Sequence, residues 1–254
     1  PFSEKEMFFR VEKGEGSKEI ALNLEKEGLI WWGSLFRGYV LATGVSGKLQ
    51  AGTYEVSSSL SISSLTKKFA KGDVAKETII IIEGWTLKDI GFYFENKGMF
   101  QAEELYDERK ELEGYLFPDT YLINYGASLT EIVEQMQDNF DKRTAGLAIT
   151  SEIITMASLI EKEARLKEDK EMVSDILWKR LKINMPLQVD AEMWTYENQG
   201  LPSKPICNPG LESILAALYP KESPYWYYLS NPDGETIFSK TLEEHNYAKA
   251  KYLR

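Results

Sequence analysis

One apolar stretch near the middle of the chain carries a glutamate in a position that a helix would bury. Residues 153–164 read IITMASLIEKEA. On a helical wheel of about 100° per residue that starts at Ile153, Ala157 and Ile154 fall at roughly 40° and 100°. Glu161 falls at roughly 80°, inside the same apolar arc. A carboxylate there is costly unless it is paired or protonated, so Glu161 needs a specific explanation.

Two interpretations of Glu161 follow from this stretch alone. In one, Glu161 lies at the edge of the core and pairs with Arg165 one turn later. In the other, it is a carboxyl kept protonated near neutral pH, which a general acid for glycosidic bond cleavage requires. Glu163 is its rival, because it falls at about 280°, at the border of the arc, where it could shape a pocket or pair with Lys167.

Composition and charge exclude several classes of function. The chain has 254 residues, of which 43% are hydrophobic, so it can bury a sizeable core. It has 30 basic and 40 acidic residues and no stripe of Lys and Arg, which argues against a nucleic-acid partner. Cys207 is the single cysteine, so an internal disulfide is excluded and no metal site is indicated. No window is apolar enough for a membrane span, and because the chain starts at Pro1 we expect it to be the soluble portion of a longer product.

A repeat at an offset of 70 residues organises the first part of the chain. Residues 11–29 read VEKGEGSKEIALNLEKEGL, and residues 81–99 read IIEGWTLKDIGFYFENKGM. Each copy predicts a short strand, a glycine turn and an amphipathic helix that Gly28 or Gly98 would end. The alternative is that two strand–turn–helix units resemble each other by chance.

The remaining patterns predict a mixed architecture. Before the break at Gly72-Asp73 we expect a helix over 35–43, a strand over 49–56 and a helix over 61–70. After it, the expected elements are a strand over 78–82, helices over 129–140, 151–166 and 169–181, a strand over 187–190, and a hairpin made of 225–230 and 236–239. The fold class is therefore α+β, with a domain boundary near residues 72–77.

Six stretches resemble one family, the endolytic murein transglycosylases or YceG-like proteins. In chain order they are LQAGTY (49–54), EGYLFPDTY (113–121), MASLIEKE (156–163), RLKINMPLQVD (180–190), GLPSKPICNPG (200–210) and TLEEHN (241–246). Each is weak by itself, whereas EGYLFPDTY together with the following IEKE and LQVD motifs is specific.

The resemblance implies a small LysM-like N-terminal subdomain, at residues 1–75, and a mixed helical and β catalytic domain, at residues 76–254. It also implies a bacterial envelope enzyme that is held by an N-terminal membrane helix absent from this chain, with its catalytic domain on the extracytoplasmic side. The implied partners are the glycan strands of peptidoglycan and, in addition, cell-wall synthases. No cofactor is implied.

The implied reaction is a lyase step within a glycan strand. It breaks the β-1,4 bond between N-acetylmuramic acid and N-acetylglucosamine and leaves a 1,6-anhydro-muramic acid end. The essential glutamate of the family matches Glu161, which would first protonate the leaving oxygen and then remove the proton of the C6 hydroxyl. Since no water is activated, a second catalytic carboxylate is not obligatory.

Further candidates accompany Glu161. The expected substrate contacts are Ser158, Glu163, Gln188, Asp190, Asp119, Tyr121 and Asn208. For Gln188 and Asp190 the alternative is hydrogen bonding at a strand end, and for Asp119 and Tyr121 it is a structural corner after Pro118. For His245, the only histidine, we expect a structural hydrogen bond. The aromatic groups 31–32 and 225–228 could stack on sugars, although core packing is their ordinary role.

Two departures and two competing functions remain. The family motif continues Asp-Pro, whereas this chain has Asp190-Ala191, and an insertion usual before the GLP segment is missing from residues 191–199. One competing function is a lysozyme-type hydrolase with Glu161 as the acid and Asp190 or Asp119 as the base. The other is a non-catalytic scaffold that binds the cell wall.

Overall fold

The structure is a computed structural model of the 254-residue chain, and it describes residues 6–253. The described chain forms two compact units. One unit runs to Ile79 and includes Tyr121–Ser128, and the other contains Ile80–Thr120 and the chain from Leu129 onward. The first unit therefore takes in the expected 1–75 subdomain together with a short segment from later in the chain.

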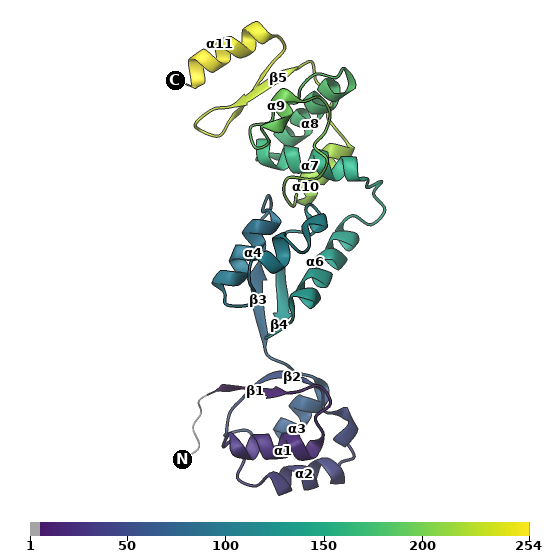
Figure 1. Ribbon diagram of the computed structural model, residues 1–254, viewed down its shortest axis with the longest axis vertical. Coiled ribbons are helices and arrows are strands. Elements are labelled where there is room, and N and C mark those ends of the chain that lie inside the picture. Colours follow the sequence, from purple (N-terminus) through teal and green to yellow (C-terminus); the bar gives the residue numbers. More distant parts are fainter. Residues whose placement is uncertain (1–5, 254) are drawn as a thin grey trace. The chain divides into compact units, whose positions relative to one another are not determined.

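The first unit is built from a two-stranded ribbon and three helices. Its elements are β1 (Met7–Val11), α1 (Ser17–Lys26), α2 (Gly33–Ala42), the 3-10 turn η1 (Ser46–Lys48), β2 (Gly52–Val56) and α3 (Ile62–Lys71). β1 and β2 pair antiparallel with Phe9 opposite Tyr54, and the helices gather on one side of this ribbon (Figure 1). The ring of Phe69 from α3 contacts Phe9, Phe36 and Tyr54, and all four side chains are fully buried.

The second unit is mainly helical and contains a hairpin that is followed by a final helix. Its elements are α4 (Leu87–Asn96), α5 (Glu103–Tyr106), the 3-10 turn η2 (Lys110–Leu112), α6 (Leu129–Arg143), α7 (Ser151–Glu163), α8 (Lys167–Lys182), α9 (Trp194–Glu197), α10 (Leu211–Leu218), β5 (Tyr227–Ser230), β6 (Thr236–Ser239) and α11 (Leu242–Tyr252). β3 (Lys76–Ile80) pairs with β4 (Thr120–Asn124), and each strand has one residue in this unit.

Helix α7 is the centre of this unit and is buried over nearly its whole length. Thr150 caps its N-terminus by accepting a hydrogen bond from the Ile153 N–H at 3.3 Å. The seven residues from Ile154 to Ile160 are all buried, in a core that they share with α8 and α10 (Figure 1). Ala164 is extended and ends the helix. Glu161 and Glu163 therefore lie on the last turn, where the helix leaves the core.

The expected repeat corresponds to two units of the same local structure. The α1 helix and the α4 helix are each ten residues long and are offset by the 70 residues of the sequence repeat. Glycines with positive φ precede and follow both helices, at Gly14 and Gly28 in the first copy and at Gly84 and Gly98 in the second. These glycines are needed because other residues rarely adopt this left-handed conformation.

One expected strand is wrong. Residues 187–190 form no strand, and Gln188 adopts a left-handed conformation with φ of 55°. The alternation was nevertheless informative about burial, because Leu187 and Val189 are buried and Gln188 and Asp190 are exposed. The α+β class and the C-terminal hairpin agree with expectation.

Candidate active site

Glu161 faces a cavity of about 570 Å3 in the second unit. Three segments line it: residues 82–85 before α4, residues 161–165 at the end of α7, and residues 230–234 in the turn after β5. The first belongs to the second copy of the repeat and the last to the hairpin turn. Sequence reasoning placed a carboxyl on the central segment but did not indicate the other two.

Three donors hold the carboxylate of Glu161. The ammonium of Lys170 lies 3.2 Å from Oε1, while the N–H of Gly210 and the hydroxyl of Ser213 donate to Oε2 at 2.9 and 2.7 Å. The side chain of Glu161 is 8% exposed and that of Lys170 is 3% exposed. All three contacts are hydrogen bonds donated to the carboxylate oxygens. The partner of Glu161 is thus Lys170 rather than Arg165, because α8 packs against α7 and brings Lys170 to it.

A second carboxyl, that of Glu83, lies beside Glu161. A Cβ on Gly210 would overlap the carboxyl of Glu83, so this carboxyl lies directly against the glycine whose N–H binds Glu161. A Cβ on Gly84 would lie 3.5 Å from Cγ of Glu161. Partial burial and then the negative charge of Glu161 raise the pKa of Glu83, and Lys170 opposes the shift. The cavity therefore contains a pair of carboxyl groups.

The completely buried side chain of Asn208 fixes the walls around this pair. Its Oδ1 accepts hydrogen bonds from the N–H groups of Gly114 and Leu116, both at 3.0 Å. Its Nδ2 donates to the carbonyl of Trp85 at 3.0 Å. Its own carbonyl accepts the N–H of Gly84 at 2.9 Å. Asn208, an expected sugar contact, instead ties the EGW, EGYLF and CNPG segments together.

A smaller cavity of about 220 Å3 adjoins the first one at Glu163. Gln188 and Asp190 both line it, so the two side chains share one hollow with Glu163 as the alternation suggested. Glu163 accepts the N–H of Asp190 at 3.0 Å, a contact that takes the place of the expected pair with Lys167. Burial, and to a lesser extent the charge of Asp190, raise the pKa of Glu163.

His245 also lines this smaller cavity, beside Arg180. Its ring stacks on Tyr227 with centroids 5.3 Å apart. Within the described residues its buried Nδ1 has no hydrogen-bond partner, so the expected structural hydrogen bond is not formed there. Burial, followed by the charges of Lys249 and Arg180, lowers the pKa of His245.

Three other expected site residues line neither cavity. The fully buried hydroxyl of Ser158 donates to the carbonyl of Thr155 at 2.7 Å and braces the backbone inside α7. Asp119 pairs with Arg143 at 2.6 Å. Burial by itself raises the pKa of Asp119. Hydrogen bonds from Asn139, the Thr120 N–H and Arg143 outweigh burial and lower this pKa below its usual value. Tyr121 is buried in β4. The positions of Asp119 and Tyr121 match the alternative of a structural corner.

Three important residues were missed in the sequence, although two left a signal. Lys170 shares the buried face of α8 with Val173 and Leu177, so helical spacing placed a lysine on an apolar stripe. Glu83 occupies the position that Lys13 holds in the first copy of the repeat, and the change of charge marked it. Nothing in the sequence distinguished Ser213 from a serine that is buried in the core.

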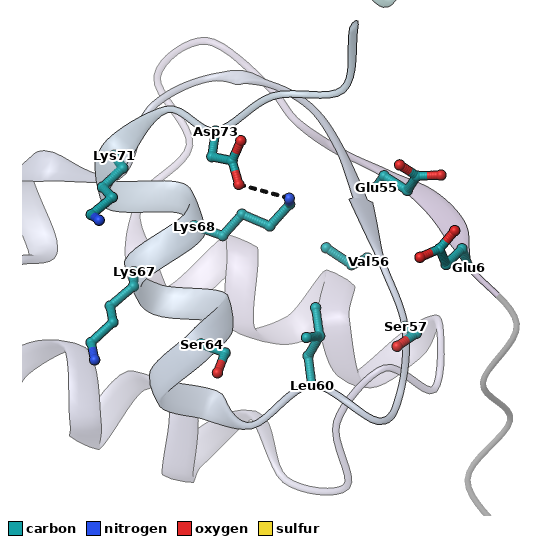
Figure 2. A pocket seen from close by; sticks show the side chains of 10 residues that line it. All are labelled: Glu6, Glu55, Val56, Ser57, Leu60, Ser64, Lys67, Lys68, Lys71 and Asp73. Atoms are coloured by element: carbon teal, nitrogen blue, oxygen red, sulfur yellow. Dashed lines mark hydrogen bonds and ion pairs between the residues drawn. The ribbon is translucent and has the colours of Figure 1, made fainter.

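The first unit has a pair of exposed tryptophans and a surface hollow. Trp31 and Trp32 are 74% and 63% exposed, so core packing was the wrong interpretation for this pair. Tyr225 to Tyr228, in contrast, are half-buried. A hollow of about 790 Å3 lies along α3, and Figure 2 shows Lys68 reaching to Asp73 there.

No helix among residues 6–253 is long and apolar enough to cross a membrane. The same residues contain no group of three or more His, Cys, Asp or Glu side chains that could hold a metal ion. Burial raises the pKa of the Cys207 thiol to about 12, so this cysteine is not poised as a nucleophile.

The motifs that build these cavities are those of a known family. The YceG-like family model matches residues 9–194 and 193–251. The chain belongs to the YceG-like family. An endolytic murein transglycosylase of Bacillus subtilis strain 168 is 31% identical to it, over 96% of this chain and 84% of that protein. One of Streptococcus pneumoniae strain D39 is 25% identical over 99% of this chain, which spans 59% of that relative.

A solved structure shows the same relationship. The crystal structure of a YceG-like protein from Listeria monocytogenes superposes with a TM-score of 0.61 at 28% identity, covering 97% of this chain and all of that one. The alignment with the B. subtilis protein extends over 302 positions, against 254 residues here. The two family matches meet at residues 193–194, within the segment where an insertion is missing.

Proposed function

We propose that this chain is an endolytic lytic transglycosylase of peptidoglycan. It cuts the β-1,4 bond between N-acetylmuramic acid and N-acetylglucosamine and leaves a 1,6-anhydro end. The observation that carries the proposal is the carboxyl of Glu161, oriented by three donors at the wall of an open cavity. Relatives along nearly the whole chain bear the name endolytic murein transglycosylase.

The minimal mechanism uses Glu161 for both proton transfers. As an acid it protonates the leaving oxygen, and as a base it then removes the proton of the C6 hydroxyl, which attacks C1. Glu163, Gln188 and Asp190 extend the binding surface into the adjoining cavity, where their polar groups can bind sugar hydroxyls. Ser158, Asn208, Asp119 and Tyr121 support the fold.

The first unit is proposed to be a LysM-like glycan-binding unit. Its order of strand, two helices and strand, with the strands paired antiparallel, supports this assignment. The exposed rings of Trp31 and Trp32 offer a surface that could stack on sugars. We further propose that the protein works at the outer face of the cytoplasmic membrane, held by a helix outside this chain, and that cell-wall synthases are its partners.

The test is a digest of purified peptidoglycan by the wild-type protein and by Glu161→Gln, with the sugar ends identified by mass spectrometry. Anhydro ends that Glu161→Gln fails to produce support the proposal. Reducing ends would make the protein a hydrolase. Binding of sacculi without any cleavage would make it a scaffold.

A further inference from the structure

We infer that Glu83 and Glu161 divide the two proton transfers of this reaction. Glu83 is the acid that protonates the leaving oxygen, and Glu161 is the base that takes the C6 hydroxyl proton. This inference rests on the proposed function and replaces the first half of its minimal mechanism.

The surroundings of Glu161 suit a base. An acid must carry a proton at rest, whereas Lys170, Gly210 and Ser213 all donate to this carboxylate. Oε2 accepts hydrogen bonds from the Gly210 N–H and the Ser213 hydroxyl, and it lies 3.4 Å from the ammonium of Lys170. Oε1 accepts a hydrogen bond from Lys170 alone, at 3.2 Å. Oε1 therefore retains a lone pair that can accept a proton.

The surroundings of Glu83 suit an acid. Its side chain is exposed to the cavity, and no hydrogen bond from the described residues reaches its carboxyl. The charges that act on it are those of Glu161 and Glu212, which favour the neutral form, and of Lys170, which opposes them. The other charged side chains that line the cavity are Asp89, Lys162, Glu163, Arg165 and Asp233. Two adjacent carboxyl groups resist double ionisation, so a proton shared by the pair is placed on the member without donors.

The proton balance of the step closes without water. The Glu83 proton moves to the glycosidic oxygen as the bond from C1 to that oxygen breaks, releasing an N-acetylglucosamine 4-hydroxyl. The C6 oxygen of N-acetylmuramic acid bonds to C1, and its proton moves to Glu161. Glu83 ends ionised and Glu161 ends protonated. Transfer of that proton between the neighbouring carboxyls, through solvent in the cavity, restores the starting state.

The test compares two substrates that differ in their need for an acid. One is a peptidoglycan glycan strand, and the other is the 4-nitrophenyl β-glycoside of a GlcNAc–MurNAc disaccharide, whose leaving group departs without protonation. Glu83→Gln should lose about 10²–10⁴-fold on the glycan and less than about tenfold on the aryl glycoside. Glu161→Gln should lose activity on both. Glu95→Gln, an exposed carboxyl on α4 outside the cavity, is the matched control and should change both rates by the same small factor.

A pH profile supplies the second measurement. The loss of glycan cleavage at alkaline pH should be present in the wild type and in Glu95→Gln but absent from the residual activity of Glu83→Gln. Wild-type glycan cleavage by Glu83→Gln, or an equal loss on both substrates, would overturn the inference while leaving the proposed function standing. Absence of anhydro ends from the wild-type digest would instead overturn the proposed function.

Discussion

Lys170 donates to both carboxylate oxygens of Glu161, at 3.2 Å from Oε1 and 3.4 Å from Oε2, and both side chains are almost completely buried. A buried ion pair contributes little net stability, but removing one partner leaves an uncompensated charge in the interior. The proposed catalytic carboxyl is therefore also part of the core, and we expect its replacement to affect stability as well as activity.

Glu161→Gln should lower the free energy of unfolding by about 3 kcal/mol, because the ammonium of Lys170 loses its anion. The double variant Glu161→Gln with Lys170→Met should recover most of that loss without recovering glycan cleavage. Urea unfolding and a glycan digest measure the two effects separately. Lys167→Met, at an exposed position of the same helix, is the control. An unfolding free energy of Glu161→Gln equal to that of the wild type would show that Lys170 is not stabilised by this pair.

Asn208→Ala should destabilise the protein by about 3 kcal/mol or more. The substitution leaves the buried N–H groups of Gly114 and Leu116 without their partner, at about 1–3 kcal/mol each, while the carbonyl of Trp85 keeps the backbone N–H of residue 208. Thermal and urea unfolding measure the loss, and Asn96→Ala, on the exposed surface of α4, should stay within about 0.5 kcal/mol of the wild type. A small effect of Asn208→Ala would mean that water replaces the amide.

Glu113 predicts a pH-dependent contribution to stability. Burial raises its pKa from 4.5 to about 7, although the Leu87 N–H and Lys204 favour the ionised form. The native state therefore holds a proton that the unfolded state releases between these values. The contribution is complete below pH 4.5 and is lost as the pH rises through 7, with a total of roughly 3 kcal/mol.

The measurement is the unfolding free energy of the wild type and of Glu113→Gln between pH 4.5 and 7.5. Their difference should change with pH in the sense just given, because the amide does not titrate. Glu111→Gln, an exposed neighbour, should follow the wild type throughout. A constant difference between wild type and Glu113→Gln would contradict the raised pKa.

The two exposed tryptophans predict that binding to intact sacculi can be weakened without a loss of glycan cleavage. Replacing Trp31 and Trp32 by Ala should leave the free energy of unfolding within about 1 kcal/mol, because both rings are largely in solvent. Binding to intact sacculi should weaken by up to about tenfold, as expected if one or two rings stack on sugars. Cleavage of short soluble glycans should be unchanged. Leu35→Ala, a nearby exposed apolar residue, is the control in the sedimentation assay.

Local patterns in the sequence predicted the elements well because short-range forces determine them. The apolar run before Glu161 gave the central helix, and the repeat gave two ten-residue helices with their glycines. The alternation of apolar and polar residues from Leu187 to Asp190 correctly predicted which side chains are buried. The strand that it also predicted is not formed. Strands require a partner, and Gln188 instead turns into the left-handed region.

Contacts between distant segments were beyond prediction for a physical reason. The choice of Lys170 over Arg165 as the partner of Glu161 depends on how α8 packs on α7, which helical spacing within α7 does not encode. Nothing in the sequence around Asn208, an expected sugar contact, indicated that its side chain is buried. Its burial became visible only when the three segments that it joins were seen together.

The twice-used strand–turn–helix unit also bears on how this kind of active site can originate. Lys13 and Glu83 precede the equivalent turn glycines of the two copies, and the lysine is exposed to solvent whereas the glutamate faces a cavity. Both copies combine a ten-residue helix with glycines of positive φ, so this local structure accepts either charge at the residue before the first glycine. In a chain that uses one strand–turn–helix unit twice, this position can thus carry a lysine in one copy and a candidate acid in the other, with the same local structure around it.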